Sequence, residues 1–204
     1  TRFAVELAKS FADADITNTI VRFNTSEGNV DLELFDTQVP LTVANFLDYI
    51  NASAFANTIF HRLDTSVGVL QGGGFQITGS PPNTQLPRIS TNPTIQAEVN
   101  LPNIPYSLAM ARSTILNSAS SEFYINIKDN TTSLGPSNNG GYTVFGQVTP
   151  ETRANFDKLA ALEALKDDPW PDSHDRPSVR KQAIAGVIAE LEKFDAGRVT
   201  DSTA

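Results

Sequence analysis

The residues with the clearest chemical potential lie in one short stretch, residues 60–75, which reads FHRLDTSVGVLQGGGF. It contains Arg62, which is predicted to share a strand face with Phe60, and then Gln71. An arginine that rises from an apolar surface is costly unless it is paired, and a glutamine side chain can orient it. The residues alone leave two interpretations open. One is a functional guanidinium oriented by Gln71, and the other is an ordinary salt bridge.

The three glycines that follow Gln71 do not form a phosphate-binding loop. Such a loop needs a lysine followed by serine or threonine after its glycines, whereas Gly74 is followed by Phe75. The segment after Phe75 is too rich in proline and glycine to supply the helix of a dinucleotide site. We therefore expect the glycines to serve a tight turn or a close approach to another part of the chain.

Three other candidates favour structural roles. Asp31 and Glu33 lie two apart in a predicted strand and so point the same way, as the carboxylates of a glycosidase could. They nevertheless belong to the polar face of an alternating strand, which favours a solvated pair. His61 is predicted to be a hydrogen-bonded structural histidine, and Trp170, between two prolines, a packing anchor.

Composition excludes several classes of function. The chain has 204 residues, a net charge of -8 and a pI near 4.7, and it contains no basic cluster, so a nucleic-acid partner is not expected. The absence of cysteine excludes disulfides, thiolate catalysis and Cys-based zinc sites, and two histidines far apart in sequence exclude a His-rich metal site. No apolar run of about 18 residues is present, so no membrane span is expected. The start at Thr1 favours an exported, for example periplasmic, protein, with a cytoplasmic location as the alternative.

The elements that must position these residues are mostly short strands. Residues 19–35 alternate apolar and polar side chains and predict a hairpin that turns at residues 26–29. Apolar spacing predicts a helix from Pro40, and a second helix with Thr149 as N-cap and Pro150 as its first residue. Residues 183–191 fit either a strand or a helix. Many short strands and two helices favour an antiparallel barrel or sandwich. Further strands are predicted within residues 58–63, 67–73, 106–112, 122–128 and 142–148.

Several motifs in this order resemble the cyclophilin family of peptidyl-prolyl isomerases, in its bacterial branch. They are GNVDLELF, PLTVANFLDYI, FHR with QGGGF, SLAMAR, SSEFYIN and YTVFGQV. The resemblance covers residues 18–195 and implies an eight-stranded antiparallel barrel capped by two helices, with a peptide groove on one outer face. Residues 1–17 would form a helical extension, and residues 196–204 a flexible tail.

The resemblance also assigns roles to individual residues. It implies that Arg62 is the catalytic donor to the prolyl nitrogen, that Gln71 orients it, and that no cofactor takes part. The expected partners are proline-containing peptides and folding proteins, bound by a monomer. The positions that match the family's substrate-binding residues are Val69, Ala109, Met110, Ala111, Glu122, Tyr124, Leu134 and Tyr142.

This chain departs from the family pattern around the expected groove. The segment between Arg62 and Gln71 is one residue longer, Glu122 replaces a glutamine, Tyr124 replaces a phenylalanine, and residues 132–133 lack a tryptophan. Glu122 could pair with Arg62 or select basic peptides. The more polar pocket makes a proline-peptide-binding module with weak catalysis the alternative function. A β-barrel carrier of small apolar ligands is a more distant one.

Overall fold

The computed structural model describes residues 18–79, 83–162 and 191–194. The predicted extension at residues 1–17, the tail at residues 196–204, Trp170 and most of the ambiguous segment 183–191 lie outside the described residues.

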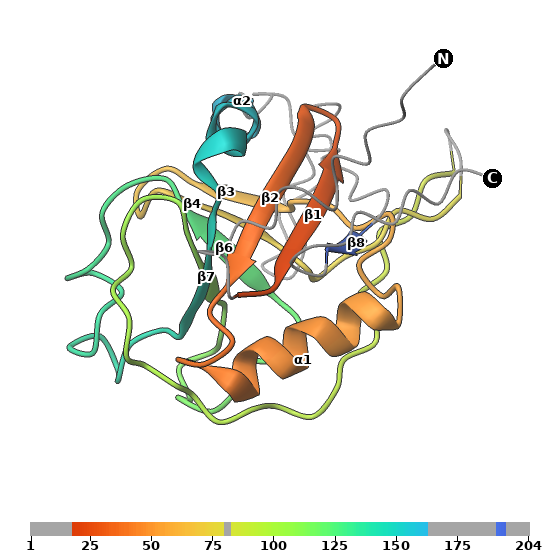
Figure 1. Cartoon of the computed structure of the whole chain (residues 1–204). Coiled ribbons are helices and arrows are strands. Elements are labelled where there is room, and N and C mark those ends of the chain that lie inside the picture. Colours follow the sequence, from red (N-terminus) through yellow and green to blue (C-terminus); the bar gives the residue numbers. More distant parts are fainter. Residues whose placement is uncertain (1–17, 80–82, 163–190, 195–204) are drawn as a thin grey trace, which may run out of the picture.

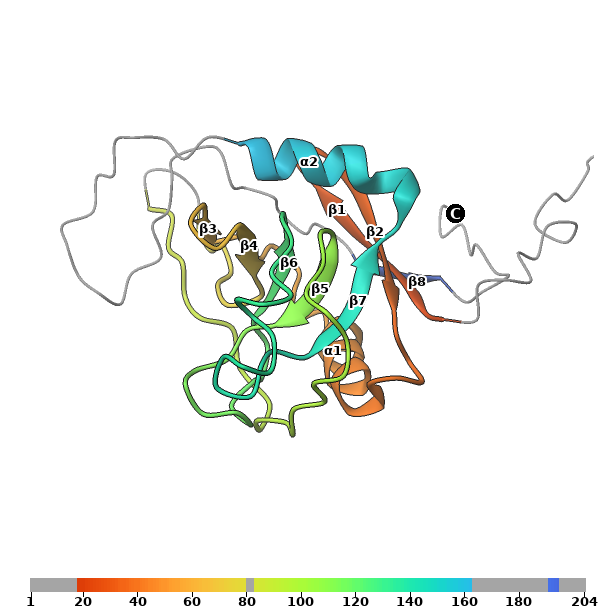
Figure 2. The same ribbon diagram turned by 90° about the vertical axis from the view of Figure 1, so that its left-hand side faces the viewer.

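A single antiparallel sheet dominates the described part of the chain. Its strands follow the order β3-β4-β6-β5-β7-β2-β1-β8, and every pairing in it is antiparallel. The sheet is strongly curled, with helix α1 at one end and helix α2 at the other (Figures 1 and 2). The prediction of eight antiparallel strands and two helices is confirmed, although β3 and β8 are the two edges of the described sheet and do not pair with each other. The strands are β1 (Ile20–Thr25), β2 (Gly28–Leu34), β3 (Arg62–Asp64), β4 (Val69–Gly72), β5 (Ser107–Met110), β6 (Phe123–Asn126), β7 (Val144–Val148) and β8 (Leu191–Phe194).

The first hairpin follows its alternating sequence. Val21, Phe23 and the apolar residues of β2 are buried, whereas the residues between them are less so. The turn is tighter than predicted, because Thr25 pairs with Gly28 and only two residues lie between them. Asp31, a weak candidate for carboxylate chemistry, pairs with Arg22 at 2.6 Å across this hairpin, which supports its structural interpretation.

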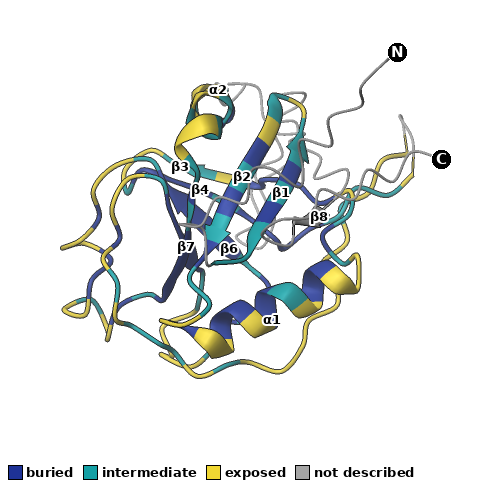
Figure 3. Ribbon diagram, viewed as in Figure 1, coloured by how far each residue is buried: buried dark blue, intermediate teal, exposed yellow. Residues whose placement is uncertain are grey.

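Helix α1 (Pro40–Asn51) closes one end of the curled sheet and turns its buried residues toward it (Figure 3). The carboxylate of Glu98 accepts hydrogen bonds from the backbone N–H groups of Leu41 and Thr42, at 3.2 and 2.8 Å, and so satisfies donors of the first turn. Phe46 projects from the helix into the core, where its ring lies 4.9–6.3 Å from those of Phe23, Phe55, Phe123 and Phe145.

The interior of the curled sheet is filled with side chains. The core includes phenylalanines from both ends of the described chain, which are at most 1% exposed. A packed interior leaves no room for a carried ligand, so the carrier alternative is wrong. These core phenylalanines are Phe23, Phe46, Phe55, Phe60, Phe123, Phe145 and Phe156.

The second helix begins later than predicted. Pro150–Thr152 form a 3₁₀ turn, η2, and α2 extends over Arg153–Ala161. Thr149 stands before the 3₁₀ turn, but its side chain makes no capping hydrogen bond to it. The hydroxyls of Thr149 and Thr152 instead lie 3.3 Å apart. Proline fixes φ at a value that both helix types share, so the sequence did not distinguish them.

Candidate functional site

Strand pairing brings the predicted site residues into one row across the outer face of the sheet. Arg62 is the register partner of Gln71, Gln71 of Tyr124, and Tyr124 of Ala109. Side chains at directly paired positions point to the same face of a sheet. The row therefore begins with the polar pair Arg62 and Gln71, at the β3 edge of the sheet, and ends in an apolar region over β6 and β5.

The polar end shows both arrangements that the sequence left open for Arg62, a hydrogen bond to Gln71 and a salt bridge to Asp64. Arg62 Nη1 donates a hydrogen bond to Gln71 Oε1 at 3.2 Å, and the Arg62 side chain is 54% exposed. One part of the prediction is wrong, because Arg62 does not share a face with Phe60. Phe60 belongs to the core together with Leu63, since regular alternation begins only at Arg62, where β3 starts.

Asp64 is a member of this site that the sequence analysis missed. Its Oδ2 pairs with Arg62 Nη2, and its Oδ1 accepts hydrogen bonds from the Ser66 hydroxyl and from the backbone N–H groups of Ser66 and Val67. The Ser66 hydroxyl, the Val67 N–H and the Arg62 charge hold the pKa of Asp64 below its usual value. The signal was present, because a residue two positions after Arg62 in a strand must share its face.

The partners of Glu122 differ from both sequence-based alternatives, which were pairing with Arg62 and selection of basic peptides. Its Oε2 accepts a hydrogen bond from Gln71 Nε2 at 2.6 Å, and its Oε1 accepts one from Arg88 Nη1 at 2.9 Å. His61 Nε2 lies 3.5 Å from Oε2. Burial raises the pKa of Glu122, but His61, Gln71 and Arg88 outweigh burial and lower that pKa to about 2. Glu122 is thus paired with Arg88 and Gln71 and not with Arg62, and Arg88 gave no signal in the sequence.

His61 forms the wall behind this polar group. Its ring meets the ring of Phe75 edge-on at 4.9 Å between centroids, and its backbone N–H donates to the carbonyl of Gln71 at 2.9 Å. The side chain is 6% exposed, and its Nδ1 atom has no hydrogen-bond partner among the described residues. His61 is therefore a buried histidine that packs against Phe75 beside Glu122.

The glycine triplet leaves space for β6 and for the site. A Cβ at Gly73, where φ is +78°, would lie 2.6 Å from the carbonyl oxygen of Ser121. A Cβ at Gly74 would lie 2.8 Å from Glu122 Oε1. The expectation of a close approach to another part of the chain is confirmed, and the approaching segment is the one that carries Glu122.

The apolar end of the row is a second cluster, separate from the main core. Tyr124 lies within it, 4% exposed, with its ring 6.0 Å from that of Tyr142. The Tyr124 hydroxyl donates to Asn103 Oδ1 at 2.8 Å, and burial raises the pKa of Tyr124 above its usual value. We call this cluster of apolar side chains the hollow, as a name for the cluster and not for a cavity. Its buried members are Val69, Ala109, Tyr124, Leu134 and Val144, and among the partly buried residues packed against them are Val67, Leu101, Ala111 and Tyr142.

The predicted substrate-binding strand needs one correction. The side chain of Met110 is 2% exposed and belongs to the main core, not to the hollow. The β5 backbone also lies between β6 and β7, and the Met110 N–H donates to the carbonyl of Thr143 at 2.9 Å. Ala109 and Met110 are therefore already paired within the sheet, whereas Ala111 lies just beyond the end of β5.

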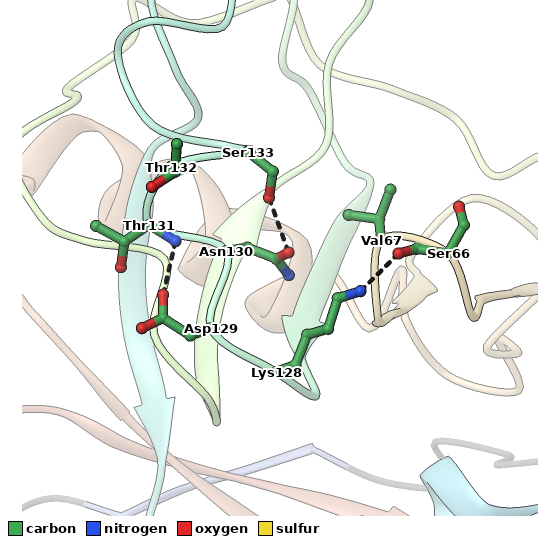
Figure 4. Close-up of a pocket in the computed structure, with 8 residues that line it drawn as sticks. All are labelled: Ser66, Val67, Lys128, Asp129, Asn130, Thr131, Thr132 and Ser133. Carbon is green, nitrogen blue, oxygen red and sulfur yellow. Dashed lines mark hydrogen bonds between the residues drawn. The ribbon is translucent and has the colours of Figure 1, made fainter.

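A polar pocket of about 540 Å³ adjoins the hollow through Val67, which belongs to both (Figure 4). Lys128 reaches across it and donates to the carbonyl of Ser66 at 2.6 Å. Small hydroxyl side chains therefore occupy the position where the sequence lacks a tryptophan. The full lining is Ser66, Val67, Lys128, Asp129, Asn130, Thr131, Thr132 and Ser133.

The described ranges show neither a metal site nor a membrane-spanning helix. No group of three or more His, Cys, Asp or Glu side chains among these residues could hold a metal ion. Neither described helix is long and apolar enough to cross a membrane.

Comparison with known proteins identifies the family. The family model described as cyclophilin type peptidyl-prolyl cis-trans isomerase matches residues 20–181. The chain belongs to this family. This cyclophilin is a peptidyl-prolyl cis-trans isomerase, and its similarity to bacterial members is substantial.

Two curated relatives illustrate that similarity. Peptidyl-prolyl cis-trans isomerase A of Dickeya dadantii is 34% identical over 178 residues, which cover 86% of this chain and 89% of the relative. Peptidyl-prolyl cis-trans isomerase B of Escherichia coli is 38% identical over 134 residues, which cover 63% and 77% of the two chains.

A solved structure supports the fold. The crystal structure of a cyclophilin type peptidyl-prolyl cis-trans isomerase of Cryptosporidium parvum superposes with a TM-score of 0.62 at 22% sequence identity, and covers 87% of this chain and 98% of that one. The same protein in the presence of the dipeptide Ala-Pro gives a TM-score of 0.60.

Proposed function

We propose that this isomerase binds proline-containing segments of folding proteins with the proline ring in the hollow, and that Arg62 donates a hydrogen bond to the prolyl nitrogen. The observation that carries the proposal is the row of paired positions. It holds an exposed guanidinium beside Gln71 and next to buried apolar side chains.

The chemistry requires only a well-placed donor. Rotation about an X–Pro bond has a barrier of about 20 kcal/mol, because the nitrogen lone pair is conjugated with the carbonyl. A donor aimed at that nitrogen stabilises the deconjugated form, which exists only near the transition state. Gln71 and Asp64 engage two of the five N–H groups of Arg62, so three can face a substrate.

Removing the guanidinium tests this proposal. We expect Arg62→Ala to lower kcat/KM on a proline tetrapeptide by about 100-fold, the usual effect of deleting one donor that stabilises transition-state charge. The measurement is a protease-coupled assay, repeated by NMR exchange between the cis and trans peptides. Arg22→Ala is the matched control, because Arg22 is also paired with an aspartate on a strand but lies in the β1–β2 hairpin. Equal rates for Arg62→Ala and the wild type would contradict the assignment.

The alternative, a proline-peptide-binding module with weak catalysis, draws on the ion pair between Asp64 and Arg62. An acidic partner occupies part of the guanidinium and lowers its electrostatic effect on a substrate. NMR titration with a proline peptide separates the two functions. Binding without faster isomer exchange would favour the module, and rapid exchange would exclude it.

Each group in the proposed site comes from this one chain. That arrangement supports activity as a monomer. Light scattering after size exclusion, at the concentration of the assay, is the direct test.

A further inference from the structure

The orientation of the Gln71 side-chain amide decides whether it can assist Arg62. The oxygen and nitrogen ends of a glutamine amide have nearly the same shape but opposite hydrogen-bonding character. In this structure Oε1 accepts from Arg62 Nη1 at 3.2 Å, and Nε2 donates to Glu122 Oε2 at 2.6 Å. If the amide were rotated by half a turn, its NH₂ group would face the donors of Arg62, and the pair would be lost.

A carboxylate at position 122 permits only one of these orientations. Ionised Glu122 accepts hydrogen bonds but cannot donate them, so it binds only the Nε2 end of Gln71. A glutamine at position 122 could face either end. Glutamate at position 122 therefore favours one of the two orientations of the Gln71 amide. A neutral glutamine at the same position would not.

Glu122 is itself held in place from two other sides. Arg88 Nη1 donates to Oε1 at 2.9 Å, and the Arg88 guanidinium lies 4.6 Å from the centre of the Phe75 ring. His61 Nε2 lies 3.5 Å from Oε2. Gly74 leaves the space that the carboxylate occupies. These contacts give Glu122 a defined position between Arg88 and Gln71 in the chain of contacts Arg88–Glu122–Gln71–Arg62.

We propose that Glu122 is a positioning residue for catalysis, which acts on Arg62 through Gln71 by fixing the amide orientation. This inference rests on the proposed role of Arg62. It departs from the sequence expectation that Glu122 binds substrate, because both of its oxygens already have partners within the protein.

A double-mutant cycle tests the proposal. We expect Glu122→Gln to lower kcat/KM by about tenfold in the wild type, the size expected for losing one charge-assisted hydrogen bond. In the Gln71→Ala background the same change should lower kcat/KM by less than about twofold, because the group on which it acts is absent. The affinity for a proline peptide, measured by NMR titration, should change by less than about twofold in each case.

Glu33→Gln is the matched control variant. Glu33 accepts a hydrogen bond from Gln147 Nε2 at 2.8 Å across paired strands, so it forms the same kind of contact away from the site. We expect no change in kcat/KM for this variant. Urea unfolding of every variant at the assay pH confirms that each is folded.

The outcomes separate this inference from the proposed function. Equal losses from Glu122→Gln in both backgrounds would overturn the positioning role, since they would show an effect that does not pass through Gln71. No loss in either background would overturn it too, while a large effect of Arg62→Ala would leave the proposed function intact. If Arg62→Ala also had no effect, the proposed function itself would fail.

Discussion

At the scale of single residues, charge is balanced pair by pair across the site. Asp64 faces Arg62 on one side, and Glu122 faces Arg88 on the other, with Gln71 between them. Arg112 lies outside these pairs, because its guanidinium is 4.3 Å from the centre of the Tyr142 ring and donates to backbone carbonyls such as that of Gly141. This arrangement gives no support to the selection of basic peptides by Glu122, because its carboxylate is already neutralised.

The acid sensitivity of Glu122 gives a prediction at this scale. Its pKa in the folded protein is about 2, below the ordinary value of 4.5, so its contribution to stability is complete above pH 4.5 and is lost as the pH falls toward 2. At pH 6 we expect the unfolding free energy of the wild type to be higher than that of Glu122→Gln. The difference should be at most on the order of 3 kcal/mol. Urea titrations from pH 6 to 2 should show this difference shrinking steadily. A difference that stays constant across that range would contradict the pKa assignment.

At the scale of elements, the close approach of β4 and β6 sets the geometry of the row. Gln71 and Tyr124 are paired positions on these strands, and Gly73 follows at the end of β4 with a positive φ. The segment after Gly72 must turn there while it passes the carbonyl of Ser121. Only glycine meets both requirements without strain.

We therefore expect Gly73→Ala to destabilise the protein by about 2 kcal/mol or more, from the backbone conformation and the contact with Ser121 together. Gly68→Ala is the matched control. Its φ is also positive at +75°, but a Cβ there meets only the flexible side chain of Lys128, which can move. Urea unfolding should show a clearly smaller loss for Gly68→Ala. Equal losses of unfolding free energy for the two variants would show that the contact with Ser121 does not contribute to the destabilisation.

At the scale of the whole molecule, the core and the hollow are separate apolar clusters on opposite faces of the same strands. Leu70, Ile125 and Leu108 are paired positions that face the core, while the neighbouring row faces the hollow. The side chains of β5 and β6 are consequently buried on both faces. If the proposed function holds, stability and binding depend on different side chains of the same strands.

Core substitutions should therefore change stability more than binding. We expect Phe46→Ala to lower the unfolding free energy by about 3–5 kcal/mol, because its ring packs against four others. Leu41→Ala on the same helix, where the side chain is 53% exposed, should cost less than about 0.5 kcal/mol. Under conditions where Phe46→Ala is still folded, its affinity for a proline peptide should match that of the wild type. A large change in affinity would show that the two clusters are coupled.

The sequence by itself determined the alternating hairpin, the helix from Pro40 and the neighbouring positions of Arg62 and Gln71, because periodic burial and short-range motifs are local properties. Tertiary structure alone decided that Arg88 binds Glu122 and that Met110 faces the core. It also decided that Asn103 anchors Tyr124. These contacts join residues far apart in the chain or depend on which face of a doubly buried strand a side chain takes. No local sequence pattern specifies long-range contacts or the face of a doubly buried strand, because the pairing of distant strands determines both.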